Sequence, residues 1–150
     1  LWGAEAKPQK WDFEDSEVGK LPTGWTAAKT GEGEGSVWKI VEDKTAPGGT
    51  HALAQLAKGP GPLFNLCVAE EAKLQDLEFS VALKPAAGKI DQGGGVVWRY
   101  SDANNYYVVR FNPLENNYRL FKVVEGKRTQ LATKDVLEVT AGKWHTLLVR

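Results

Sequence analysis

The stretch that decides the fold is Gly93-Gly94-Gly95-Val96-Val97-Trp98-Arg99-Tyr100-Ser101-Asp102-Ala103-Asn104-Asn105-Tyr106-Tyr107-Val108-Val109-Arg110. Its two halves are rich in the β-branched and aromatic residues that favour strands. Between them, positions 101–105 hold only small and polar residues of the kind that form turns. The stretch therefore predicts two antiparallel strands, 95–100 and 106–112, joined by a five-residue turn.

Similar patterns extend outward from this hairpin in both directions. In 77–84, the apolar residues Leu77, Phe79, Val81 and Leu83 alternate with mostly polar ones, which is typical of a half-buried strand. Further strands are predicted at 36–42, 118–124 and 144–150, with turns at 113–117 and 125–127. Two glycine- and proline-rich stretches, 19–35 and 46–62, are predicted to be long loops. Short strands joined by hairpin-length turns are typical of an antiparallel β-sandwich or barrel.

Composition indicates a globular protein of one domain. The 150 residues are 42% hydrophobic and 25% charged, and 19 basic residues balance 19 acidic ones. This balance argues against a nucleic-acid partner, and no apolar run approaches the roughly 20 residues of a membrane helix. The single cysteine, Cys67, excludes an internal disulfide framework and a multi-cysteine zinc site. All five arginines lie at or after Arg99, so guanidinium groups are concentrated in the predicted meander.

The two ends of the sequence carry expectations of their own. The chain has no methionine, and Ala4-Glu5-Ala6 has the small-x-small form of a signal-peptidase site. We therefore expect residues 1–6 to end a signal peptide and residues 7–150 to form a single domain of a secreted or periplasmic protein. Because 144–150 is a strand pattern without a polar tail, we also expect the domain to continue C-terminally.

Several segments resemble, in order, the motifs of one family. Trp11-Asp12-Phe13-Glu14, followed by Gly19-Lys20-Leu21-Pro22-Thr23-Gly24-Trp25, resembles the opening strand of a concanavalin-like jelly roll. The hairpin 93–110 is similar to that of LamG-like domains and of the 3-keto-disaccharide hydrolase-like family of bacterial secreted proteins. Gly142-Lys143-Trp144-His145-Thr146-Leu147 is similar to a later strand of that group. The resemblance implies an all-β jelly-roll sandwich that either binds a glycan or hydrolyses a modified glycoside.

The hairpin holds the side chains that sugar recognition needs, which are flat aromatic faces and planar polar groups. Positions 93–124 contain all four tyrosines, Trp98 and three arginines. Alternation across the predicted turn places on one face Trp98, Tyr100, Tyr106, Val108 and Arg110, and on the other Val97, Arg99, Tyr107, Val109 and Phe111. A bulge would exchange these faces.

We predict that a glycan or other polyhydroxylated ligand binds on the concave sheet. The predicted stacking platforms are Trp98, Tyr100 and Tyr106 or Tyr107, and the predicted hydrogen-bonding groups are Arg99, Arg110 and Asn112.

An enzymatic function is the alternative. A glycoside hydrolase or lyase of the kind that the resemblance implies would use His145, Asp102 or Glu115 together with an arginine. The hydrolase-like members carry an Asn-Gly-x-x-Leu-x-x-Trp stretch where this chain has 14–20, so binding without catalysis is the leading interpretation.

No cofactor is predicted, although Asp91 would suit a loop calcium site. The favoured interpretation of Asp91 and Asp102 is that both are ordinary turn or loop aspartates. A non-catalytic protein-interaction domain is the third interpretation of function.

Overall fold

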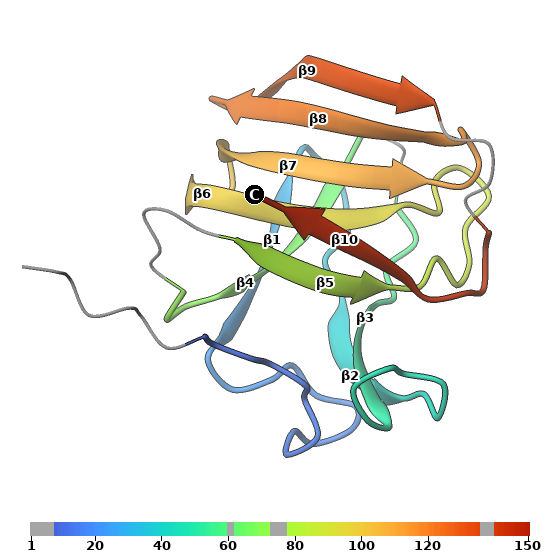
Figure 1. Ribbon diagram of the computed structural model, residues 1–150. Helices are drawn as coiled ribbons and strands as arrows, with labels where there is room; N and C mark the ends of the chain where they lie inside the picture. The colour runs from blue at the N-terminus through green and yellow to red at the C-terminus, as the bar shows by residue number, and fades with distance from the viewer. Residues whose placement is uncertain (1–7, 60–61, 73–77, 136–139) are drawn as a thin grey trace, which may run out of the picture.

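The computed structural model describes residues 8–59, 62–72, 78–135 and 140–150 (Figure 1). Within these ranges the chain forms strands and no helix, which confirms the predicted all-β class. The strands are β1 Trp25–Thr30, β2 Trp38–Glu42, β3 His51–Gln55, β4 Phe64–Ala69, β5 Phe79–Leu83, β6 Gly94–Asp102, β7 Asn105–Asn112, β8 Asn117–Val124, β9 Lys127–Asp135 and β10 His145–Val149. Their pairings are antiparallel, and the arrangement is sandwich-like. The expected signal segment, 1–6, lies outside the described residues.

The largest sheet is the four-stranded meander β6-β7-β8-β9, drawn yellow to orange in Figure 1. It follows chain order because each connection is a short hairpin turn. The β8–β9 turn places Glu125 and Gly126 at φ 50° and 74°, the left-handed conformation that two-residue hairpin turns require. The β6–β7 turn is shorter than the predicted one, since pairing continues to Asp102 and Asn105.

A β-bulge at Arg99 interrupts the pairing of β6 with β7. The register runs regularly to the pair Trp98 and Tyr107, then shifts before Asp102, and Arg99 has φ 49°. Three residues of β6, 99–101, therefore lie opposite the single residue Tyr106 of β7, and such an irregularity re-aims the side chains of the strand. The predicted grouping of Trp98 with Tyr100 and Tyr106 is therefore wrong. Trp98 pairs with Tyr107 on one face, whereas Tyr100 and Tyr106 lie together on the other.

Three two-stranded pairs accompany the meander: β1-β4, β2-β3 and β5-β10. β1 and β3 lie within the stretches 19–35 and 46–62 that were predicted to be loops, and neither β4 nor β9 was predicted. Pairing stabilises each of these strands: β1 and β4 pair with each other across the fold, whereas β3 and β9 pair with the strands that precede them in the chain.

The main core lies between the β1-β4 pair and one face of the meander, here called the inner face. It is made of the buried residues Leu66, Tyr106, Val108, Phe121 and Val123, with Ala28, Phe64, Val97 and Tyr100 packed against them. The opposite face of the meander is called the outer face. These two faces carry different sets of the candidate site residues.

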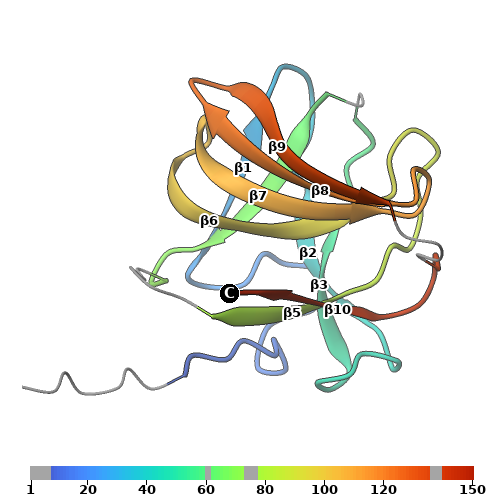
Figure 2. The ribbon, with the colours of Figure 1, turned by 45° about the horizontal axis from the view of Figure 1, so that its top comes forward.

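The β5-β10 pair lies beneath the meander in Figure 2, and its contacts with the outer face are made near Phe111. The ring of His145 packs edge-on against Phe111, with centroids 5.4 Å apart. Leu83 lies close to Gly94, the cross-strand partner of Phe111. The other end of the outer face, where Trp98 and Tyr107 lie, is half-buried.

Candidate functional site

The outer face carries a pair of stacked aromatic rings, Trp98 and Tyr107, which we call the aromatic platform. The ring centroids are 5.9 Å apart and the ring planes are inclined by 24°. Both rings are half-buried, so each keeps part of its surface open to solvent. Direct cross-strand pairing of the two residues brings their side chains together. The result is a pair of near-parallel aromatic rings that keep part of their surface at the edge of solvent.

Two cationic side chains flank the platform. The Arg99 guanidinium lies 6.0 Å from the centre of the Tyr107 ring, within cation–π range. Lys122 is the partner of Tyr107 on the next strand, β8, and therefore shares the outer face with it. Both cations are exposed. Arg99 was predicted as a site residue, but Lys122 was not. The predicted turn 113–117 would pair Tyr107 with Val123, whereas the observed pairing of Asn112 with Asn117 shortens the turn by one residue and brings Lys122 opposite Tyr107.

Two of the predicted stacking residues lie on the inner face instead. Tyr106 is only 2% exposed, and its hydroxyl lies 2.5 Å from Oγ1 of Thr30. Burial raises the pKa of Tyr106. Tyr100 is half-buried beside it, with ring centroids 6.1 Å apart. Tyr106 is therefore a core residue that a surface ligand does not reach, which corrects its prediction as a stacking platform.

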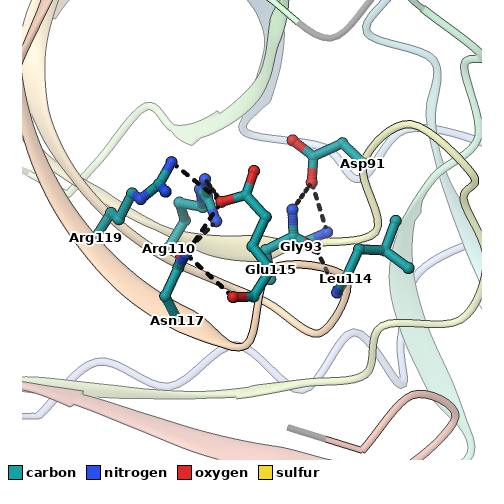
Figure 3. Close-up of polar contacts among 8 residues, drawn as sticks. Asp91, Gly93, Arg110, Leu114, Glu115, Asn117 and Arg119 are labelled. Atoms are coloured by element: carbon teal, nitrogen blue, oxygen red, sulfur yellow. Dashed lines mark hydrogen bonds and ion pairs between the residues drawn. The ribbon is translucent and has the colours of Figure 1, made fainter. Parts of the chain in front are cut away.

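A polar network occupies the end of the inner face beyond the core, around Glu115 in the β7–β8 turn (Figure 3). One carboxylate oxygen, Oε2, accepts from Arg110 Nη2 at 2.9 Å, Arg119 Nη1 at 3.1 Å and Asn117 Nδ2 at 3.2 Å. Arg110 also donates to Oδ1 of Asn117 at 3.2 Å. Arg110 above all, with desolvation opposing it, lowers the pKa of Glu115. A carboxylate that is held ionised in this way serves poorly as a general acid.

Asn112 and Asp91 form a second hydrogen-bonded group, and Figure 3 labels Asp91 together with Gly93 and Leu114, to which this group is bonded. Asn112 is 0% exposed, and its Nδ2 donates to Oδ1 of Asp91 at 2.7 Å. Asp91 also accepts from the backbone N–H of Gly93 at 3.0 Å, and Asn112 accepts from the N–H of Leu114 at 3.1 Å. These bonds tie the loop before β6 to the end of β7. Asn112 is therefore a buried residue that holds the loop before β6 against the end of β7, which corrects its prediction as a ligand-binding group.

The remaining candidates lie apart from one another. Asp102 accepts from the N–H of Asn104 at 2.7 Å and from the side chain of Asn105 at 3.0 Å, so it closes the β6–β7 turn. His145 Nε2 bonds the carbonyl oxygen of Thr140 at 2.8 Å. Among the described residues, no hydrogen bond or ion pair joins His145, Asp102 or Glu115 to another of the three. The same residues contain no cluster of three or more metal-binding side chains around Asp91 or elsewhere.

Comparison of the chain with protein-family models, curated proteins and solved structures found no match. The described part of the chain also has no helix that is long and apolar enough to cross a membrane. The assignment of function consequently depends on the geometry of the aromatic platform and the polar network.

Proposed function

We propose that this domain binds a glycan or a similar polyhydroxylated ligand on the aromatic platform. The carrying observation is the near-parallel, half-exposed stack of Trp98 on Tyr107. A pyranose ring presents a flat C–H surface that packs well on such rings, whereas an edge-on aromatic cluster offers no comparable surface. The hydroxyl of Tyr107 and the guanidinium of Arg99 would supply hydrogen bonds to the sugar hydroxyls.

The strands that carry the platform place its side chains before any ligand arrives, which favours binding. Its rings are held by strands that pair on both sides of β7, and Arg99 is held against the Tyr107 ring. Side chains that are already ordered lose little conformational entropy when a ligand binds. A weakly interacting, heavily hydrated sugar depends on this advantage more than an apolar ligand does.

The proposal includes a finer description of the fold and location. We take the all-β arrangement as part of a concanavalin-like jelly roll related to LamG-like and 3-keto-disaccharide hydrolase-like domains, and the protein as secreted or periplasmic. The order of the motifs at 11–25, 93–110 and 142–147 supports this view. Cell fractionation with an antibody against the chain tests the location independently of the ligand.

Binding is tested by isothermal titration calorimetry of the chain against neutral and acidic oligosaccharides. We expect Trp98→Ala to weaken binding at least about tenfold, because truncating an aromatic anchor typically costs about 2 kcal/mol. Trp11→Ala is the matched control, since Trp11 is 44% exposed and lines a separate pocket of about 180 Å³ with Trp25. Thermal unfolding confirms that both variants are folded.

Each outcome has a defined meaning. Binding that survives Trp98→Ala but is lost in Trp11→Ala would move the site to the pocket near Trp25. Product formation in the same mixtures would replace the binding proposal with the hydrolase alternative. Absence of binding to every glycan would overturn the proposal and favour a protein-interaction domain.

A further inference from the structure

We propose that the aromatic platform selects acidic glycans, with Arg99 and Lys122 holding an anionic group such as a uronate carboxylate. This inference rests on the proposed glycan site and adds the chemical class of its ligand. It follows from the position of the two cations, from the absence of an ion-pair partner for either of them among the described residues, and from the backbone that places Arg99.

The bulge is the device that brings Arg99 to the ligand side. In a regular strand, Trp98 and its neighbour Arg99 would point to opposite faces. Here the left-handed conformation of Arg99, with φ 49°, breaks that alternation, and the guanidinium lies over the Tyr107 ring on the outer face. A positive φ is uncommon for a residue other than glycine, and such strain is concentrated at functional sites. The adjacent residues Trp98 and Arg99 therefore both lie on the outer face.

Neither flanking cation is neutralised within the described part of the chain. Arg110 and Arg119 share Glu115, and Arg150 pairs with Glu78. Arg99 and Lys122, in contrast, make no ion pair or side-chain hydrogen bond among the described residues. The nearest acidic residue in sequence, Asp102, has its carboxylate engaged by Asn104 and Asn105.

The arrangement of charge around the rings matches a uronic acid. The C–H face of the sugar would cover Trp98 and Tyr107, and the carboxylate at the ring periphery would lie between cations on β6 and β8. A planar guanidinium fork binds a carboxylate with two parallel hydrogen bonds. A sulfate ester offers the same charge with tetrahedral oxygens, so the anionic substituent is the shared chemistry.

The test compares ligands that differ only in charge. Oligogalacturonate and oligomannuronate are titrated calorimetrically against the chain, each beside its methyl ester, and a sulfated galactan forms a third arm. We expect each acid to bind at least about tenfold more tightly than its ester, because a hydrogen bond to a charged group contributes about 1.5 kcal/mol or more. The preference should shrink as salt rises, since the Debye length falls to about 3 Å at 1 M.

Three variants connect the preference to the named residues. Arg99→Asn removes the guanidinium and keeps a residue that tolerates the left-handed bulge, and Lys122→Gln removes the charge from a regular strand position. Each should lower affinity for the acid about tenfold. Lys122→Gln should leave affinity for the ester unchanged, whereas Arg99→Asn, which also removes a donor to the sugar hydroxyls, should lower affinity for the ester less than affinity for the acid. Lys134→Gln is the matched control, because Lys134 pairs with Tyr118 on the outer face, about 13 Å along the strand from the platform.

The outcomes separate this inference from the proposed function. Equal affinity for acids and esters, or binding of neutral glycans alone, would overturn the acidic preference and leave the glycan site intact. An acid preference that survives both Arg99→Asn and Lys122→Gln would overturn the assigned residues. If Arg99→Asn does not fold, Lys122→Gln alone decides this point. Absence of binding to every sugar would overturn both the preference and the site.

Discussion

Tyr106 and Tyr107 are neighbours in the chain, and their side chains lie on opposite faces of the four-stranded sheet. Tyr107 belongs to the half-exposed platform, whereas Tyr106 is buried and joins the meander to β1 through Thr30. The hydroxyl of Thr30 also donates to the carbonyl oxygen of Ala103 at 2.5 Å. We therefore expect Tyr107 to contribute to the proposed ligand recognition and Tyr106 to stability.

Tyr106→Phe is expected to reduce the free energy of unfolding by about 1 kcal/mol, which is typical of one buried hydrogen bond. The measurement is urea denaturation followed by tryptophan fluorescence. Tyr118→Phe is the control, because no hydrogen bond to the Tyr118 hydroxyl is present among the described residues, so its effect should be clearly smaller. Equal effects of the two substitutions would show that the bond to Thr30 adds no stability. Glycan affinity should not change in either variant.

At the scale of the element, β6 shows how far the sequence predicts the site. Alternation of aromatic and β-branched residues correctly locates β6 and β7 and brings the hairpin aromatics together. The same pattern cannot reveal the bulge, because an arginine at positive φ leaves no local signal of the kind that a glycine would. The bulge alone decides that Trp98 stacks on Tyr107 and that Tyr100 joins the core.

The strands β1 and β4 and the network around Glu115 were also missed because they depend on pairing between strands. β1 and β4 form because they pair with each other across about forty residues of chain. A short window of sequence around either strand does not contain its partner, so local propensity cannot predict it. Glu115 was recognised as a candidate carboxylate, but its two arginines come from facing positions on β7 and β8. Cross-strand register, which depends on exact turn length, is needed to predict such a network.

The strain at Arg99 gives a prediction about β6. Arg99→Gly should change the free energy of unfolding by less than about 1 kcal/mol, because relief of the left-handed conformation, about 1–2 kcal/mol, offsets the backbone entropy cost of glycine, about 0.5–1 kcal/mol. Arg99→Val should be destabilising by about 1–3 kcal/mol, since a β-branched residue resists positive φ. Chemical denaturation measures both. Lys122→Val, at a regular strand position, should have little effect, and a similar cost for valine at both positions would contradict a strained bulge.

At the scale of the whole molecule, the parts are held together by side chains that bridge separate strand pairs. Asp43, which follows β2, forms an ion pair with Lys84, which follows β5. Asp43 also accepts from the hydroxyl of Thr45 at 2.6 Å, and that hydroxyl accepts from Nε1 of Trp144 at 3.1 Å. The Lys84 ammonium lies 5.2 Å from the Trp144 ring centre. This cluster fixes the β2-β3 hairpin to the β5-β10 pair, which contacts the outer face.

The cluster makes stability depend on pH in a predictable direction. The hydrogen bond from Lys84, followed by those from Thr45, lowers the pKa of Asp43 from 3.8 to about 2. A group whose pKa is lowered by folding stabilises the folded state above its unfolded pKa and loses this contribution as the pH falls through its folded pKa. Asp43→Asn should therefore lower the thermal midpoint at pH 6, and the difference from the unmodified chain should disappear as the pH approaches 2. Asp15→Asn, at an exposed carboxylate without an ion pair in the described residues, should show no such convergence. A constant difference between pH 6 and pH 2 would mean that Asp43 stabilises through packing alone, and that the β2-β3 hairpin is not held electrostatically.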